Sequence, residues 1–356
     1  MSIGRREFLK RAATIAGSSL LGSSSSAIVH AYEKGSPSIF STGNTANLRN
    51  WKLYEKIEAT LPRERYGILV DTTKCIGCRR CEWACNEWNK NPNKPIKEFE
   101  ESVIGKDDVF KYIRRMHAGN FTVVNRYFSS KDGKPIYVKR QCMHCEDPAC
   151  LASCFVDAYR KATISPVLYL SQVCIGCRYC MIACPFDVPA FEYYEALNPQ
   201  ITKCTMCYDR IISGLVDLPV GARKPSSTVP ACVEICPAEV MRFGKREDLI
   251  NLAHERIRND PGKYVDHVYG EHEVGGTSWL YLSAVPFEEI GFKTDIGKTP
   301  IPNLSKGFLF GVKMFEIVGA WPLVFGAYYA ISKARKKAKA SHETSAEKGE
   351  GHGEKH

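Results

Sequence analysis

Residues 174–185 read CIGCRYCMIACP, which places four cysteines at the spacing C-x2-C-x2-C-x3-C with a proline after the last one. Three thiolates at this spacing bind the irons of one 4Fe-4S cube, while the fourth cysteine of such a run binds a neighbouring cube. The stretch therefore predicts iron–sulfur clusters held by cysteine, and it predicts that the clusters come in pairs.

Three further groups of four cysteines repeat this pattern, so that none of the sixteen cysteines in the chain is left over. The second group has one wider step, C-x2-C-x4-C-x3-C, and the fourth is split between residues 207 and 232. The groups are Cys75, Cys78, Cys81 and Cys85; Cys142, Cys145, Cys150 and Cys154; Cys174, Cys177, Cys180 and Cys184; Cys204, Cys207, Cys232 and Cys236. Four complete quartets predict four 4Fe-4S clusters with all sixteen cysteines as iron ligands.

The first residues of the chain have the features of an export signal. The segment GRREFLK at residues 4–10 resembles a twin-arginine signal, although Gly4 stands where that signal usually has Ser or Thr. A short, weakly apolar stretch and a small residue at Ala31 follow. The twin-arginine pathway exports proteins already folded around their cofactors. We therefore expect a signal peptide over residues 1–31.

A second targeting feature lies at the other end. Residues 307–332 are rich in large apolar side chains and long enough to cross a bilayer. Lys313 and Glu316 lie in the first third of this segment, where snorkelling to the interface is favoured over a polar substrate path. A basic run follows at 333–339, which the positive-inside rule places in the cytoplasm. This predicts one transmembrane helix in the inner membrane, a periplasmic body and a basic, disordered cytoplasmic tail over 333–356.

Other roles for the cysteines fit the spacing less well. Disulfides are common in exported, cysteine-rich chains, but cysteines three residues apart rarely anchor a disulfide framework. Structural zinc uses paired C-x2-C knuckles, which leaves the third and fourth thiols of each run without a role. Covalent haem is excluded because no C-x2-C is followed by His. The spacing favours iron–sulfur clusters over all three.

The net charge does not indicate a nucleic-acid-binding protein. The formal charge is +10 with every thiol counted as neutral. An oxidised 4Fe-4S cube with four thiolates carries about −2, so four cubes would remove about eight units. The loaded protein is then close to neutral, and much of its positive charge lies at the two ends.

The rest of the chain predicts an α+β fold of duplicated, bacterial-ferredoxin-like βαβ-type modules. Strand-like runs at 66–70 and 167–170 each lead directly into a cysteine group, which indicates an internal duplication. We expect a lead-in at 32–62 and a four-cluster domain at 63–244. Its insertion at 86–141, with a strand-like run at 121–128, is expected to cover the clusters without ligating them.

A C-terminal extension without cysteine is expected at 245–306. Its apolar rhythm predicts a helix at 247–258, ended by Pro261 and Gly262. From Tyr269 the sequence predicts a loop along the surface that returns to a strand at about residue 282.

The order of the quartets, with CPF at 184–186 and PACVEICP at 230–237, resembles the four-cluster ferredoxin subunits of membrane oxidoreductases. That group includes the β subunit of formate dehydrogenase-N and the iron–sulfur subunits of dimethyl sulfoxide and polysulfide reductases. The twin-arginine start, GEHEVGGT at 270–277 and the single span are most similar to iron–sulfur subunits of the hydrogenase-2 type. The resemblance covers nearly the whole chain.

Spacing alone leaves two pairings of the quartets open, sequential or nested. The resemblance implies the nested one, first with fourth and second with third. Carried over residue by residue, it gives the ligand sets Cys75, Cys78, Cys81 and Cys236; Cys85, Cys204, Cys207 and Cys232; Cys142, Cys145, Cys150 and Cys184; Cys154, Cys174, Cys177 and Cys180. Gly77 and Gly176, each inside a Cys-Ile-Gly-Cys, would let the backbone approach a cube closely.

We interpret the chain as a non-catalytic electron-transfer subunit, since it carries no nucleotide loop and no activated nucleophile. The resemblance implies an extracytoplasmic partner, which is a hydrogenase, a formate dehydrogenase, another molybdopterin enzyme or a multihaem cytochrome. It also implies a multi-span membrane subunit that reacts with quinone. The alternative is a membrane-tethered polyferredoxin that stores electrons or assists assembly outside a respiratory complex.

Overall fold

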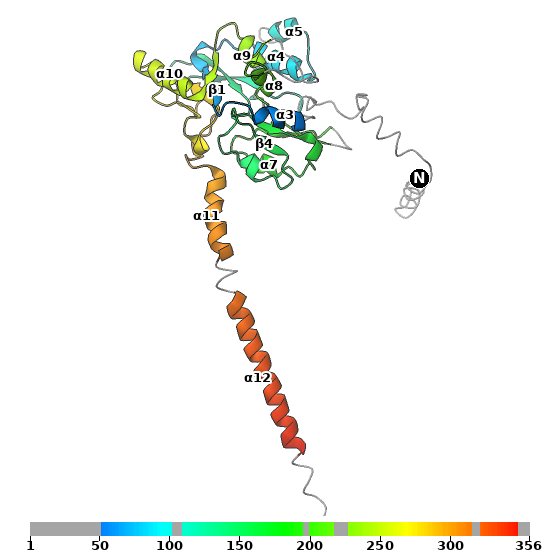
Figure 1. Cartoon of the computed structure of the whole chain (residues 1–356). Coiled ribbons are helices and arrows are strands. Elements are labelled where there is room, and N and C mark those ends of the chain that lie inside the picture. Colours follow the sequence, from blue (N-terminus) through cyan, green and yellow to red (C-terminus); the bar gives the residue numbers. More distant parts are fainter. Residues whose placement is uncertain (1–50, 102–108, 195–198, 217–226, 315–320, 348–356) are drawn as a thin grey trace, which may run out of the picture. The chain divides into compact units, whose positions relative to one another are not determined.

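A computed structural model describes residues 51–101, 109–194, 199–216, 227–314 and 321–347. The predicted signal peptide at 1–31 lies outside these residues. The first described helix is α3 (Trp51–Glu58), and Figure 1 shows the order of the elements along the chain.

A three-stranded sheet positions the first cysteine group. Its central strand β1 (Tyr66–Asp71) pairs antiparallel with β8 (Met241–Lys245) and parallel with β9 (Trp279–Leu282). Helix α10 (Arg246–Asn259) packs against β1 and confirms the helix predicted at 247–258. The C-terminal extension thus contributes one edge of this sheet.

Both faces of β1 are covered, because its side chains alternate between two clusters of buried residues. Ile68 and Val70 belong to the main core, while Leu69 packs with Leu249 of α10 in a second cluster. A strand buried on both faces needs apolar residues at successive positions, which explains the run Ile68-Leu69-Val70.

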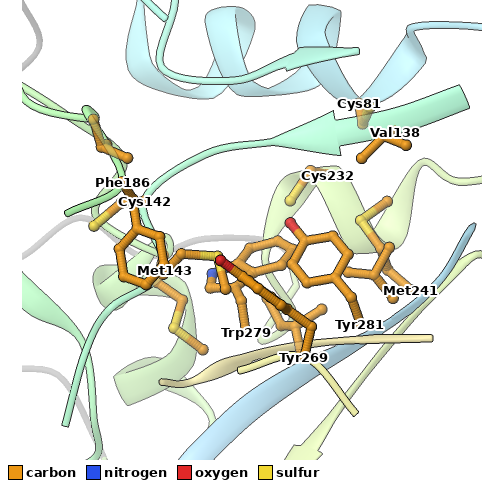
Figure 2. Packing of buried hydrophobic residues seen from close by; sticks show 14 of the residues in the cluster. Cys81, Val138, Cys142, Met143, Phe186, Cys232, Met241, Tyr269, Trp279 and Tyr281 are labelled. Carbon is orange, nitrogen blue, oxygen red and sulfur yellow. The ribbon is translucent and has the colours of Figure 1, made fainter. Parts of the chain in front are cut away.

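The main core includes cysteines as well as apolar side chains. Figure 2 shows Cys81, Cys142 and Cys232 among the buried residues of this core, together with Trp279 and Tyr281 of β9. The cysteine groups are therefore part of the folded interior.

The predicted duplication is confirmed by two equivalent units. In the first, β1 leads through the short 3-10 helix η2 (Thr72–Lys74) to Cys75 and then to α4 (Arg80–Asn89). In the second, β5 (Val167–Tyr169) leads through η3 (Ser171–Val173) to Cys174 and then to α7 (Tyr179–Ala183).

The remaining strands form three short antiparallel pairs. These are β2 (Val123–Phe128) with β3 (Pro135–Arg140), β4 (Tyr159–Lys161) with β5, and β6 (Ala190–Phe191) with β7 (Ile201–Thr202). The strand predicted at 121–128 is thus confirmed as β2. The short helices are α5 (Ile96–Glu101), α6 (Ala149–Ala152), α8 (Tyr208–Ser213), α9 (Ala231–Glu234) and η4 (Glu273–Gly275).

The prediction of a surface loop after Tyr269 was wrong. Tyr269, Thr277 and Ser278 have no exposed surface, and Val274 is 2 % exposed. The segment is buried because Tyr269 pairs with Tyr281 of β9 and because Thr277 forms a bridge to Cys145. The polar residues of GEHEVGGT suggested exposure to solvent. Those that are buried, Glu273 and Thr277, have side chains that form hydrogen bonds inside the protein.

Two helices follow the body of the chain, α11 (Ile301–Met314) and α12 (Trp321–Glu347). The predicted span at 307–332 includes residues 315–320, which lie outside the described part. Among the helices that the structure describes, none is long and apolar enough to cross a membrane. The structure differs from the predicted disordered tail, because α12 continues to Glu347. Ala, Lys, Arg and Glu dominate this region and are strong helix formers.

Candidate metal centres

A small cavity is lined by four thiols from two separate parts of the sequence. Cys75, Cys78 and Cys81 come from the loop after η2 and from α4, while Cys236 comes from the turn after α9. Val124 of β2 and Met241 of β8 are among the apolar residues that complete the wall.

A second cavity is lined by Cys85, Cys204, Cys207 and Cys232, together with Trp279 of β9. Helix α4 thus carries one thiol of each cavity, Cys81 and Cys85, one turn apart. In the same way, Cys232 in α9 lines the second cavity, whereas Cys236 in the turn after α9 lines the first. This is the nested arrangement of the first and fourth quartets.

The other eight cysteines gather into two sets. Burial raises the pKa of the Cys145 thiol well above its ordinary value, and Cys142, Cys184 and Cys150 raise it further by electrostatic repulsion. These four thiols therefore lie near one another.

The fourth set is recognised in the same way. Burial is the main cause of the raised pKa of Cys180, to which repulsion from Cys174, Cys154 and Cys177 adds. The structure thus brings together all four of the sets named from the resemblance. That each set ligates one cluster stays a prediction.

Backbone geometry around the thiols suits thiolate ligands. The amide N–H of Gly176 donates to Cys174 Sγ at 3.4 Å, that of Met206 to Cys204 Sγ at 3.3 Å, and that of Ala158 to Cys154 Sγ at 3.3 Å. Hydrogen bonds to the sulfurs are one of the features that set the potential of an iron–sulfur cluster.

One residue in the wall of the second cavity, Trp279, carries a buried hydrogen-bond donor. Trp279 has no exposed surface, and its indole Nε1–H has no hydrogen-bond partner in the part of the chain that the structure describes. Leaving such a donor unpaired costs about 1–3 kcal/mol. An anionic, sulfur-rich group in the cavity that Trp279 lines would supply an acceptor. The residues present therefore fit a 4Fe-4S cluster.

One thiol of each cavity, Cys75 in the first and Cys204 in the second, is a poor acid in the absence of metal. Burial raises the pKa of Cys75 to about 12 and that of Cys204 to about 12. Only thiolates bind metal, so loading must release these protons. None of the sixteen cysteines forms a disulfide. Within the described ranges, no group of three or more His, Cys, Asp or Glu side chains is arranged around a single-ion site.

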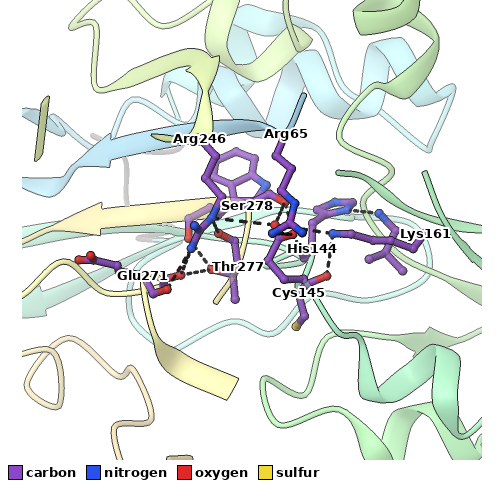
Figure 3. Close-up of polar contacts among 12 residues, drawn as sticks. Arg65, His144, Cys145, Lys161, Arg246, Glu271, Thr277 and Ser278 are labelled. Atoms are coloured by element: carbon purple, nitrogen blue, oxygen red, sulfur yellow. Dashed lines mark hydrogen bonds and ion pairs between the residues drawn. The ribbon is translucent and has the colours of Figure 1, made fainter. Parts of the chain in front are cut away.

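The loop that carries the second quartet is fixed by the C-terminal extension, as Figure 3 shows. Ser278 Oγ donates to the carbonyl of His144 at 2.9 Å, and Arg246 Nε donates to the carbonyl of Thr277 at 2.8 Å. Lys161 Nζ donates to the carbonyl of Cys145 at 2.8 Å. The extension therefore holds a cysteine loop in position, a role that its sequence did not reveal.

Sequence reasoning also missed Lys139 and Trp279, which line the cavities. Neither belongs to a motif. Lys139 lies in the insertion that was expected only to cover the clusters, and three residues before Cys142. The alternation of β3 gives no signal for it either, because the adjacent residues Val138 and Lys139 are both buried although they point to opposite faces of the strand.

Comparisons with known proteins agree with this site. A family model described as a 4Fe-4S dicluster domain matches residues 134–246. A protein of Nitratidesulfovibrio vulgaris is 46% identical over 80% of this chain and 72% of its own length. The hydrogenase-2 operon protein HybA of Escherichia coli is 34% identical over 63% of this chain and 71% of its own. The formate dehydrogenase-O iron-sulfur subunit of Escherichia coli is 30% identical over 76% of this chain and 80% of its own.

Proposed function

Because this chain belongs to the family of ferredoxin-type iron–sulfur subunits of oxidoreductases, we propose that it carries electrons through four 4Fe-4S clusters. The observation that carries the proposal is the pair of neighbouring cavities, each lined by four thiols and no more. A 4Fe-4S cluster takes four thiolates and, when bound, supplies one-electron chemistry.

The side chains of this protein have three tasks in that function. The sixteen cysteines hold the clusters in the four nested sets. Apolar residues such as Val124, Val240 and Met241 exclude water from the first cavity, and burial is one of the factors that set cluster potentials. Backbone N–H groups at Gly176, Met206 and elsewhere donate to the sulfurs.

The proposed partners stand at the two ends of the relay. One is an extracytoplasmic hydrogenase, formate dehydrogenase, other molybdopterin enzyme or multihaem cytochrome, and the other is a multi-span membrane subunit that reacts with quinone. The relatives' names support this, since they include a hydrogenase-2 operon protein and a formate dehydrogenase iron-sulfur subunit. We propose export by the twin-arginine pathway, a periplasmic body and an anchor in the inner membrane at 307–332.

Iron analysis tests the proposal directly. Anaerobically purified protein should contain about sixteen irons and about sixteen acid-labile sulfides per chain, with a broad absorption at about 400 nm. Substantially lower values, or a colourless protein, would refute a four-cluster relay.

Purification from native membranes tests the proposed partners, and a truncated chain tests the proposed membrane anchor. The chain should co-purify with a catalytic or cytochrome subunit and with a multi-span subunit, whereas an electron store would be isolated alone. Deletion of residues 306–356 should release the body into the periplasmic fraction. Retention of the truncated chain on the membrane would show that residues 306–356 are not its required anchor.

A further inference from the structure

Lys139 is a buried cation that lies between the two thiol-lined cavities. It is 3 % exposed and occurs on β3, where it pairs with Val124 of β2. Among the residues that the structure describes, it is the one that lines both the cavity of Cys81 and the cavity of Cys85. Its position is therefore shared by two of the proposed clusters.

The ammonium group has neutral neighbours. Lys139 Nζ donates to Gln141 Oε1 at 2.8 Å and lies 4.4 Å from the centroid of the Trp279 ring. No carboxylate of the described ranges lies within 4.0 Å of it. An isolated charge in a protein interior costs several kcal/mol unless opposite charge compensates it. The thiol sets on its two sides are where that opposite charge would lie.

Hydrogen bonds to both the backbone and the side chain of Lys139 support its position. The carbonyl of Lys139 accepts a hydrogen bond from Tyr281 Oη at 3.0 Å. Gln141 Nε2 donates to the same Tyr281 oxygen at 2.6 Å, which holds the amide that contacts Nζ. Tyr281 and Trp279 are both on β9 and have no exposed surface.

We propose that Lys139 is a positioning residue that raises the reduction potentials of the two clusters held by the first and fourth quartets, and of those two only. The inference rests on the proposed function. Each reduction adds one electron, which one proposed partner of the relay donates and the other then accepts. Lys139 keeps its proton throughout and stabilises the added negative charge by Coulomb attraction, which is stronger in an interior of low dielectric than in water.

Trp279 allows a sharper version of the same idea. Trp279 lines the second cavity but not the first, and its indole N–H has no hydrogen-bond partner among the described residues. Trp279 should therefore raise one of the two potentials that Lys139 raises. The two residues together predict unequal effects on the two clusters. The potential of one cluster depends on both Lys139 and Trp279, and the potential of the other depends on Lys139 alone.

The test is a redox titration of the full-length protein in its membrane complex, followed by electron paramagnetic resonance. In Lys139→Gln, two of the four potentials should fall by at least the equivalent of a tenfold change in equilibrium constant, about 59 mV for one electron. In Trp279→Phe, one of those two should fall. The exposed, ion-paired Lys245 provides a control, and Lys245→Gln should change none.

Two further variants test the inference if Lys139→Gln binds too little iron to be titrated. Gln141→Glu is nearly isosteric and puts a carboxylate beside Nζ, so it should lower the same two potentials while keeping the ammonium. Lys139→Arg keeps the charge and should stay near the wild-type values. The inference is overturned if the loaded variants leave all potentials unchanged, shift all four equally, or shift clusters outside a common pair. If wild-type protein itself lacks four clusters, the proposed function fails instead.

Discussion

The carboxylate of Glu82 accepts two hydrogen bonds from the guanidinium of Arg114, at 2.5 Å and 2.9 Å. Glu82 is fully buried on α4, next to Cys81, whereas Arg114 belongs to the insertion between the first two cysteine groups. Arg79 Nη2 donates to the same carboxylate at 2.8 Å, and so does the backbone N–H of Val124 at 2.6 Å. One carboxylate therefore joins the cysteine helix to the insertion.

Glu82→Gln should destabilise the loaded protein by about 3–5 kcal/mol, because it leaves two guanidinium groups without their buried counter-charge. Denaturant unfolding under anaerobic conditions, followed by the loss of cluster absorption, measures the effect. Glu98→Gln is the matched control, since Glu98 is more than half exposed and pairs with Lys94 at 3.7 Å, and it should change stability by less than about 1 kcal/mol. Equal stabilities of the two variants would contradict the assigned role.

The pH dependence of Glu82 follows from its surroundings. Burial opposes ionisation, but the hydrogen bonds and charges of Arg114 and Arg79 outweigh burial and lower the pKa of Glu82 below its ordinary value of 4.5. Its contribution to stability is thus present above pH 4.5 and is lost as the pH falls through the lower, folded-state pKa. The stability difference between wild type and Glu82→Gln should shrink on acidification below about pH 4.5. A difference that stayed constant on acidification would rule out the ion pair as its source.

His267 and Glu273 should give a second, opposite pH dependence. The hydrogen bond to Glu273, 2.7 Å long, raises the pKa of His267 above 6.5. Burial works against ionisation of Glu273, but the bonds from His267 and Gly270 lower its pKa below 4.5. The pair is therefore fully effective between about pH 4.5 and 6.5. The advantage of wild type over His267→Gln should decline as the pH rises above 6.5, as unfolding at several pH values would measure.

Gly77 should tolerate no side chain. Its φ is +73°, and a β-carbon there would lie 2.5 Å from Cδ1 of Tyr137. Gly133 has a similar φ of +66° but no atom within 4 Å of such a carbon, so it isolates the backbone cost, about 1–2 kcal/mol. Gly77→Ala should therefore cost clearly more than Gly133→Ala and should reduce iron content. Similar losses of stability in the two variants would mean that the Tyr137 contact is unimportant.

Paired cysteine substitutions test the nested arrangement. Cys81 and Cys236 line one cavity, so the double variant Cys81→Ser, Cys236→Ser should lose one cluster, about four irons. Cys81→Ser with Cys232→Ser affects both cavities and should lose about eight irons. Sequential pairing predicts a two-cluster loss for the first variant, so iron counting decides between the arrangements.

The local sequence was sufficient to predict the cluster type and several secondary-structure elements of this protein. The spacing of the cysteines indicated the cluster type, and the strand-like runs before Cys75 and Cys174 predicted the two equivalent units that the structure contains. These features are local, since a turn, a 3-10 helix and the start of a helix are specified by a few consecutive residues. The helix at 247–258 and the strand at 121–128 were predictable for the same reason.

Tertiary structure alone decided which thiols share a cavity and what surrounds them. The division of α4 between two cavities depends on the docking of α9, which is distant in sequence. Likewise, Lys139, Trp279 and the buried segment after Tyr269 acquire their roles only when β9 pairs with β1. Long-range packing sets burial and local dielectric, and no short stretch of residues encodes either quantity.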